Sequence, residues 1–256
     1  MIYFLIPAYN EEQNIITILN NISQKVSEDY EIFVINDGSI DRTKEIVEDA
    51  EKKIPITLIS HYPNKGVGAV FNTGFSAILK ECNDDDIIIS LEADNTGDLN
   101  ILDKMINNIK SGYDISLASC YAKEGGIEGT TLDRKILSLG ANTLLKIFFP
   151  IKGVKTFSSF YRAYNAGMLK KAFKAYDNKL IEMPGFVCMV EMLIKLWRLK
   201  IKIIEVPMIL KFNMRQDKSK MKIGKNIRGY LKLIKNEFFL KDKKKYRQAM
   251  QKYLNL

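Results

Sequence analysis

The sequence predicts an α/β fold in which a mostly parallel sheet is covered by helices on both faces. Short runs rich in Ile, Val, Phe and Leu alternate with longer stretches of helical periodicity, and the connections between them are short. This alternation is typical of parallel sheets, because each strand must return across a face of the sheet before the next one begins. Carboxylates directly follow several of the apolar runs, at the position where such sheets bind ligands.

Five strands and four helices are expected in the first half of the chain. The strand candidates are residues 2–6, 31–36, 56–60, 86–91 and 114–118. The helix candidates are residues 12–26, 41–52, 67–80 and 99–111. Ser39 and Asp41 precede the second helix and Asp98 precedes the fourth, and short polar side chains of this kind cap helix N-termini.

The pattern is less regular after about residue 120. Glycines at 125, 126 and 129 indicate a loop, after which residues 132–149 and 186–199 read as amphipathic helices and residues 201–206 as a strand. The last stretch, residues 223–256, places apolar side chains at helical spacing among lysines. We therefore expect a domain of residues 1–221 and a basic, amphipathic helical extension of residues 222–256.

The composition excludes several classes of protein. The chain has 256 residues, three cysteines without CxxC spacing and one histidine, so neither a zinc site nor a disulfide framework is supported. No apolar run approaches the roughly 20 residues that span a bilayer, and the N-terminal apolar run is too short for a signal peptide. These features favour a cytoplasmic protein.

The positive charge is concentrated in the C-terminal quarter. Residues 195–256 contain 19 lysines and arginines against four acidic residues, whereas residues 1–194 contain 20 against 26. A basic region of this kind attracts phosphates of nucleic acid, lipid headgroups or a phosphorylated substrate. It lacks a recognisable reading motif for nucleic acid, so a nucleic-acid partner is not expected. A solvated surface, kept for solubility, is the other interpretation.

Three polar segments at strand ends carry the functional signal. They are Pro7-Ala8-Tyr9-Asn10-Glu11, Asn36-Asp37-Gly38-Ser39 and Glu92-Ala93-Asp94. Carboxylates at neighbouring strand ends can share one cleft, and hard oxygen ligands suit Mg²⁺ or Mn²⁺. A nucleoside diphosphate held through a divalent cation needs this chemistry.

These segments, with others farther along, resemble family 2 glycosyltransferases of the Rossmann-like GT-A fold. Within that family the chain looks most like polyprenyl-phosphate sugar synthases of the dolichol-phosphate mannosyltransferase type. The resemblance covers residues 1 to about 221. Besides the three strand-end segments, its motifs are Asn64-x-Gly66 with Asn72 and Gly74, Phe160-Tyr161-Arg162, Glu205-Val206-Pro207, and Arg215 followed by Ser219-Lys220.

The resemblance implies a set of residues that binds a nucleoside-diphosphate sugar. These residues are Pro7, Tyr9, Glu11, Asp37, Gly66, Arg215, Ser219 and Lys220. Asp37 would contact the base or ribose, and Arg215 with Lys220 would clamp the diphosphate from a loop that closes over it. Asn36 stands where many relatives have a first aspartate.

The metal ligands implied by the resemblance are Asp94 and Glu92, which would bind Mg²⁺ or Mn²⁺. The chain departs from the family here, because Glu92 stands in place of Asp and Thr96 in place of Gln. The coordination geometry is therefore expected to be shifted or to include more water. Ordinary acidic loops that bind nothing are the alternative.

The resemblance implies that arginines bind the acceptor substrate. Arg134, with Ser138 one turn later, matches the position at which relatives bind the acceptor phosphate, and Arg162 belongs to a segment used near the sugar. Three departures weaken this assignment: Cys120 in place of Arg, Thr156 in place of Asp and Phe160 in place of Gly. A sugar hydroxyl acceptor, or an inactive relative that binds nucleotide or anionic membrane, therefore remains open.

The expected reaction is a single displacement with inversion at the anomeric carbon, with Asp94, Arg134, Arg162 and Glu191 as its catalytic residues. A phosphate acceptor needs no general base, whereas a hydroxyl acceptor does, and Glu191, Glu182 and Asp133 are the candidates. Glu191 lies in an apolar run, where it is either a scaffold salt bridge or a reactive group. His61 is expected at the surface or at a strand end.

The basic extension is expected to lie on an anionic membrane, with its aromatic residues turned inward and its lysines toward the headgroups. A protein bound in this way would be peripheral at the inner face of the membrane. The alternative is a helix packed on its own domain or on a second subunit. The sequence gives no information on oligomeric state.

Overall fold

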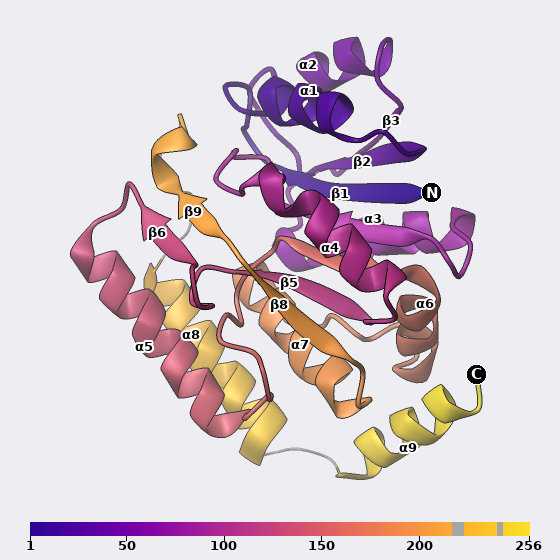
Figure 1. Cartoon of the computed structure of the whole chain (residues 1–256), viewed down its shortest axis with the longest axis vertical. Coiled ribbons are helices and arrows are strands. Elements are labelled where there is room, and N and C mark those ends of the chain that lie inside the picture. Colours follow the sequence, from indigo (N-terminus) through magenta and orange to yellow (C-terminus); the bar gives the residue numbers. More distant parts are fainter. Residues whose placement is uncertain (217–222, 240–242) are drawn as a thin grey trace.

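The computed structural model describes residues 1–216, 223–239 and 243–256, and its centre is a seven-stranded sheet (Figure 1). The strand order is β3-β2-β1-β4-β7-β5-β8. The strands are β1 (Ile2–Ala8), β2 (Tyr30–Asn36), β3 (Ile56–Ser60), β4 (Ile87–Ser90), β5 (Ile115–Ser119), β7 (Arg162–Asn165) and β8 (Ile203–Pro207). Only β7 among them runs antiparallel, between β4 and β5. The predicted α/β class is confirmed.

A second sheet of two strands joins distant parts of the chain. It pairs β6 (Gly126–Glu128) with β9 (Ile209–Lys211) in parallel. Neither strand nor β7 was expected from the sequence, because all three are short and carry few apolar residues. The small sheet places the segment before residue 132 beside the segment after residue 211.

Helices cover both faces of the large sheet. The helices in chain order are α1 (Ile15–Lys25), α2 (Thr43–Glu51), α3 (Val67–Glu81), α4 (Leu102–Lys110), α5 (Leu132–Phe148), α6 (Ala166–Ala175), α7 (Cys188–Arg198), α8 (Ile223–Ile234) and α9 (Lys243–Leu254). The boundaries of α1 to α5 and α7 agree with the prediction to within three residues at each end, while α6 was missed. Short 3₁₀ turns precede α4 and α7, and a π-helical turn, Lys235–Phe239, follows α8.

The alternation of side chains along β1 divides the core into two layers. Tyr3 and Leu5 pack with α3, α6 and α7 on one face, whereas Ile2, Phe4 and Ile6 pack with α1 and α4 on the other. A third apolar cluster lies between α5, α7 and α8. All three cysteine thiols, Cys82, Cys120 and Cys188, are buried and unpaired.

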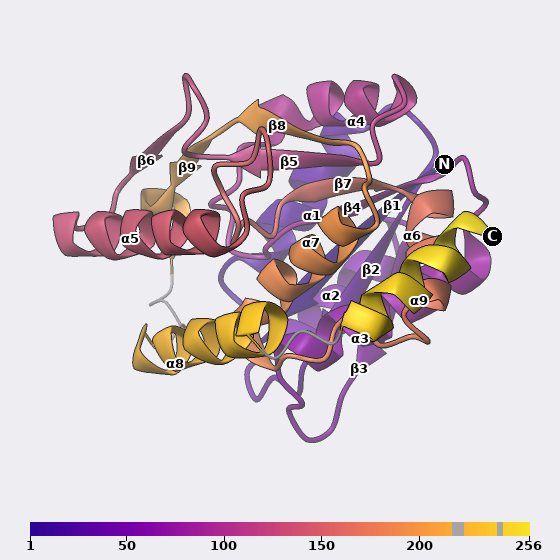
Figure 2. The same cartoon turned by 90° about the horizontal axis from the view of Figure 1, so that it is seen from below.

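The C-terminal extension packs on the domain rather than standing apart from it. Leu233 and Ile234 of α8 enter the third cluster, and Ala249 of α9 enters the core around α6. Figure 2 shows α9 lying along α6, with α8 beside α5. The contact of α9 with α6 agrees with the alternative of a helix packed on its own domain, and membrane binding by the extension stays a prediction. The expected boundary at residue 221 falls outside the described residues and stays a prediction.

No described helix combines the length and apolar character that a membrane crossing requires.

Candidate active site

The polar segments at the ends of β1, β2 and β4 meet at one edge of the sheet. In the strand registers Ala8 pairs with Asn36, and Leu5 pairs with Ser90. The backbone N–H of Asp37 donates to the carbonyl of Ala8 at 2.8 Å. Because parallel strands end at the same edge of the sheet, the loops at residues 7–11, 36–39 and 91–96 lie together there, as the sequence pattern predicts.

The Asp37 carboxylate is buried and binds the loop that follows β3. Its Oδ1 accepts from the N–H of Lys65 at 2.9 Å, and its Oδ2 accepts from the N–H of Gly66 at 2.8 Å. Gly66 has φ +87 and precedes α3, so it adopts a backbone conformation that a side chain would strain. Asp37 therefore fixes the start of α3 at the edge of the sheet where the strand-end segments meet.

His61 is a site residue that the sequence reasoning missed. It directly follows β3, as one expectation stated, but it is only 5% exposed, so the expectation of a surface position is wrong. Its Nδ1 lies 2.8 Å from Asp37 Oδ1 and its Nε2 lies 2.9 Å from Thr73 Oγ1. An ionised carboxylate can only accept, so Nδ1 carries the hydrogen in this pair. The place of His61 at the end of the strand next to β2 is the signal that could have identified it.

The loop after β4 presents two carboxylates, Glu92 and Asp94. Asp94 Oδ1 accepts from the N–H of Thr96 at 3.1 Å and from its Oγ1 at 2.7 Å. Burial, and then the charge of Asp94, raise the pKa of Glu92 to about 8. Thr96 thus orients Asp94 through its own hydroxyl.

These two carboxylates fit a divalent cation that completes its coordination with other oxygens. The described residues contain no group of three or more His, Cys, Asp or Glu side chains that could hold a metal. Mg²⁺ is commonly bound through one or two carboxylates plus substrate phosphates and water, and the pair matches that pattern. Burial is the larger cause of the raised pKa of Glu92 and the charge of Asp94 is the second, and a bound cation would offset both.

An arm formed by the residues after β9 closes against this carboxylate loop. The N–H of Lys211 donates to the carbonyl of Thr96 at 3.0 Å, and Arg215 Nη2 lies 3.0 Å from Asp94 Oδ2. The buried Nε of Arg215 has no hydrogen-bond partner within the part of the chain that the structure describes. A guanidinium that holds one carboxylate and keeps a donor unpaired is suited to receive an additional anion. Ser219 and Lys220, predicted to act with it, lie outside the described residues.

Asn14 ties the arm to two of the strand-end loops, and the sequence reasoning did not identify it. Its Oδ1 accepts from the N–H of Gln216 at 3.2 Å, and its Nδ2 donates to Glu11 Oε2 at 2.9 Å. The side chain of Asn95 donates to the Asn14 carbonyl at 3.0 Å. The predicted residue Glu11 is itself buried, and its contact with Asn14 makes it part of the frame of the cleft.

Pro7 and Tyr9 lie at the end of β1 and directly after it. Pro7 is half-buried, opposite Ile35 of β2, and Tyr9 is 37% exposed. Their place beside Asp37 is consistent with the predicted wall of a nucleotide cleft.

Arg134 is exposed in the first turn of α5, with the half-buried Ser138 four residues later. The small sheet places the start of α5 near the arm that carries Arg215. A Cβ on Gly129, between β6 and α5, would lie 2.5 Å from the backbone nitrogen of Asn213 in the arm. Arg134 and Arg215, the two predicted anion-binding arginines, therefore lie on the neighbouring segments that follow β6 and β9.

Arg162 has a structural role, which corrects its assignment to the catalytic residues. Its side chain is fully buried in β7. Nε, Nη1 and Nη2 donate to the backbone carbonyls of Ser159, Met189 and Phe157 at 2.7, 2.9 and 2.8 Å. With each nitrogen bound to a carbonyl and no exposure to solvent, the guanidinium supports the scaffold behind the site.

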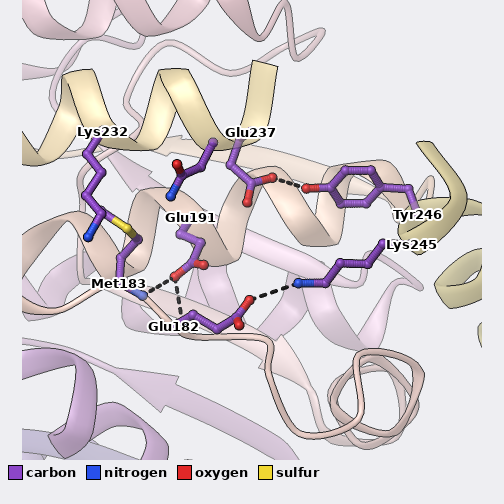
Figure 3. A pocket seen from close by; sticks show the side chains of 8 residues that line it. Glu182, Met183, Glu191, Lys232, Glu237, Lys245 and Tyr246 are labelled. Carbon is purple, nitrogen blue, oxygen red and sulfur yellow. Dashed lines mark hydrogen bonds and ion pairs between the residues drawn. The ribbon is translucent and has the colours of Figure 1, made fainter. Parts of the chain in front are cut away.

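Glu191 also belongs to the scaffold, so its assignment as a catalytic residue is corrected too. It is 3% exposed, forms a 2.8 Å ion pair with Lys195, and accepts from the N–H groups of Glu182 and Met183 at 2.8 and 2.7 Å. Figure 3 shows it in a hollow of about 390 Å³ between α7 and the C-terminal helices, whose lining includes none of the strand-end residues. Lys195 and Lys245 also pair with Glu182.

The three departures from the family pattern lie in packed surroundings. Ser119 and Thr156 share a 2.7 Å hydrogen bond between their hydroxyls, and burial raises the pKa of Cys120 to about 11. Phe160 is buried between Phe71 and Phe186, with ring centroids 5.3 and 5.7 Å apart. Its bulk is thus accommodated in the apolar core beneath α3.

Comparison with known proteins agrees with this geometry. The sequence model described as "Glycosyl transferase family 2" matches residues 3–177. A dolichol-phosphate mannosyltransferase of Pyrococcus furiosus is 32% identical over 232 residues, which cover 90% of this chain and 61% of that protein. A dolichyl-phosphate beta-glucosyltransferase of Trichomonas vaginalis is 29% identical over 248 residues, which cover 92% of this chain and 72% of that protein.

Solved structures share the fold. Glucosyl-3-phosphoglycerate synthase of Mycobacterium tuberculosis, crystallised with Mn²⁺, UDP and glucosyl-3-phosphoglycerate, has a TM-score of 0.67 at 17% identity, covering 95% of this chain and 81% of that one. The same enzyme crystallised with Mg²⁺ and UDP has a TM-score of 0.68 at 18% identity, again covering 95% and 81% of the two chains. The GT-A fold is therefore shared.

Proposed function

Because the chain belongs to glycosyl transferase family 2 and is a glycosyltransferase, we propose that it moves a sugar from a nucleoside-diphosphate sugar to a polyprenyl phosphate, with inversion and with Mg²⁺ or Mn²⁺. The observation that carries this proposal is the ion pair between Asp94 and Arg215, which lies beside Glu92 at the strand ends. That arrangement offers an acidic pair for a cation and a guanidinium for the diphosphate. Named relatives act with dolichol phosphate, which supports a lipid-phosphate acceptor.

On the donor side, Asp37 contacts the base, and Pro7 and Tyr9 line the cleft. A bound Mg²⁺ or Mn²⁺, held by Asp94 and Glu92, would neutralise charge on the diphosphate leaving group. The Arg215 guanidinium, whose Nε has no hydrogen-bond partner among the described residues, would stabilise the negative charge that grows on this diphosphate as the sugar departs. Ser219 and Lys220 remain proposed partners of Arg215 in this step.

On the acceptor side, Arg134 binds the phosphate and orients one of its oxygens toward the anomeric carbon. That oxygen forms the new bond to carbon while the bond from the carbon to the nucleoside diphosphate breaks, which inverts the configuration. The acceptor is already anionic near neutral pH, so no protein base has to take a proton. This agrees with the pairing of Glu191 and Glu182 to lysines, which leaves neither as a plausible base for a hydroxyl.

An apolar surface on α5 and α8 supports a lipid acceptor. We call it the α5–α8 face, and its exposed members are Leu132, Ile136, Leu137, Leu139, Leu144, Ile147, Ile227 and Leu231. Exposed apolar side chains in this number on two neighbouring helices are typical of a membrane or partner contact, and basic residues on the same helices favour an anionic bilayer. The face replaces the whole extension as the proposed membrane contact, because α9 packs on α6. The protein would then be peripheral at the inner face of the membrane.

The chain spans 61% of the length of the Pyrococcus relative, so substrates and location are proposals for this chain. The test is a transfer assay with radiolabelled UDP- and GDP-sugars, a polyprenyl phosphate in detergent, and Mn²⁺, Mg²⁺ or EDTA. Label should pass to the lipid phase only with metal present. Donor binding with transfer only to free sugars would favour a hydroxyl acceptor, and donor binding without any turnover would favour an inactive relative.

A further inference from the structure

The contacts of Asp37 limit how many more hydrogen bonds this carboxylate can accept. An ionised carboxylate offers about four acceptor positions, two on each oxygen. His61 and Lys65 donate to Oδ1, and Gly66 donates to Oδ2. Both positions of Oδ1 are filled, and one remains on Oδ2.

The orientation of the His61 ring, and with it the hydrogen bond to Asp37, is fixed by contacts on both sides of the ring. It is buried, and Thr73 Oγ1 at 2.9 Å from Nε2 fixes the ring on its other side. The Nδ1 hydrogen is therefore aimed at Asp37 by a partner on α3 as well as by the carboxylate itself. The N–H groups of Lys65 and Gly66 are backbone donors and cannot be removed by a side-chain change.

Nucleobases differ in the number of donors that they present to such a group. The Watson–Crick edge of uracil carries one N–H, at N3, with a carbonyl on each side. Guanine carries two adjacent donors, N1–H and the 2-amino group, which match the two oxygens of a free carboxylate in parallel. A carboxylate with one position left satisfies uracil, but it leaves one of the two guanine donors without a partner, and an unmatched buried donor lowers affinity.

From this count, we infer that His61 is a specificity-determining residue that makes the donor site select uridine over guanosine diphosphate sugars. The inference rests on the proposed function, because it requires Asp37 to contact the base. His61 acts through Asp37 and does not itself touch the sugar or the reacting atoms. The protein is accordingly a UDP-sugar enzyme, even though one of its relatives is named for mannosyl transfer.

The test is the ratio of the Kd values of GDP and UDP, measured by calorimetry with Mn²⁺ on the full chain. We expect wild-type protein to bind UDP about tenfold or more tightly than GDP. His61→Ala opens one position on Oδ1, so each oxygen can then accept once, and the preference should fall to about threefold or less. His61→Asn keeps an N–H near the place of Nδ1 and should therefore keep the preference for UDP that His61→Ala loses.

Two further variants separate selectivity from folding. Thr73→Val removes the outer partner of His61 but leaves the Asp37 contact, so it should retain most of the preference. His61→Gln reaches toward Thr73 rather than Asp37 and should lose the preference, which provides a second variant if His61→Ala does not fold. Because His61 is the only histidine in the chain, its imidazole NMR signal is assigned without ambiguity and should shift on addition of UDP.

The outcomes divide cleanly. Equal or tighter binding of GDP by the wild type overturns the inference and leaves the proposed function standing. A UDP preference that is unchanged in folded His61→Ala and His61→Gln overturns the role of His61. Failure to bind either nucleotide overturns the proposed function and the inference together.

Discussion

The proposed donor side and the proposed acceptor side of this molecule are built in opposite ways. At the strand ends, Asp37, Asp94 and Asn14 each hold several hydrogen bonds of 2.7–3.2 Å, and the arm that carries Arg215 is fastened over them. On the α5–α8 face, large apolar side chains stand exposed, Leu132 to 72% and Ile147 to 70%. A preorganised polar site suits a small charged ligand, whereas a bare apolar face suits a lipid surface.

The difference suggests that the two substrates are recognised by different physical means. Donor recognition depends on the number and direction of hydrogen bonds, so single-atom changes should matter there. Acceptor recognition depends on apolar area and on one exposed arginine, so it should respond to charge and hydrophobicity rather than to fine geometry. The following predictions test that contrast.

The largest effect is expected from Asp94→Ala on the donor side. The change removes a proposed metal ligand and the partner of Arg215, so the transfer rate should fall by at least about 10²–10³-fold. Mn²⁺-dependent UDP binding, followed by calorimetry, should weaken in parallel. Asp103→Ala, which removes an exposed carboxylate on α4, is the matched control and should leave both unchanged. Activity within threefold of wild type in Asp94→Ala would contradict the proposed site.

A smaller effect is expected from the double change Ile136→Glu with Leu231→Glu on the α5–α8 face. Two apolar contacts are replaced by charges, so binding to vesicles with 30% anionic lipid should fall by about 10²-fold in flotation assays. Transfer to a short-chain, water-soluble acceptor phosphate should stay the same. Ile40→Glu is the control, since Ile40 is 90% exposed in the loop before α2. Equal vesicle binding by double variant and wild type would refute the membrane role of this face.

The smallest effect concerns pH. The pKa of Glu92 is raised to about 8, so binding of Mn²⁺ must displace a proton below that pH, and affinity should rise by up to about tenfold per pH unit between pH 6 and 8. In EDTA, the folded state holds this proton more tightly than the unfolded chain does. Stability should therefore decrease as pH rises from about 5 toward 8.

Glu92→Gln cannot titrate and should flatten both profiles. Calorimetry in buffers of different ionisation enthalpy measures the released proton, and thermal melts in EDTA measure the stability. An unchanged slope in Glu92→Gln would assign the titration to another group.

Sequence patterns predicted the parallel strands of the large sheet well because each is an apolar run, but they missed the short parallel pair β6 and β9. They failed for β7, whose sequence Arg-Ala-Tyr-Asn carries a charge in the middle of a sheet. That charge is tolerated because three backbone carbonyls surround Arg162. Those of Phe157 and Ser159 come from the segment just before β7, and that of Met189 comes from α7, a contact that no local pattern reveals. The same limit explains Glu191, whose apolar surroundings fitted a scaffold salt bridge and a reactive group equally well.

The strand-end carboxylates could be expected to meet, because parallel strands end at the same edge. The residues that position these carboxylates could not be predicted from the sequence. His61 lies 24 positions from Asp37 in sequence, and Gln216 lies 202 positions from Asn14, so these contacts depend on how loops fold back over the sheet. Membrane contact was expected on the C-terminal extension, whereas most exposed apolar side chains of the proposed α5–α8 face lie on α5. Amphipathic periodicity alone did not show which side of α5 the core covers.

The burial of the three thiols has a practical use. The pKa values of Cys120 and Cys188 are raised to about 11 and 12, and that of Cys82 is also raised, so these groups remain protonated and shielded at neutral pH. A cysteine introduced by Ile136→Cys or Leu231→Cys would thus be the fast-reacting thiol of the chain. A fluorophore attached there could follow, in real time, the approach of this face to a bilayer.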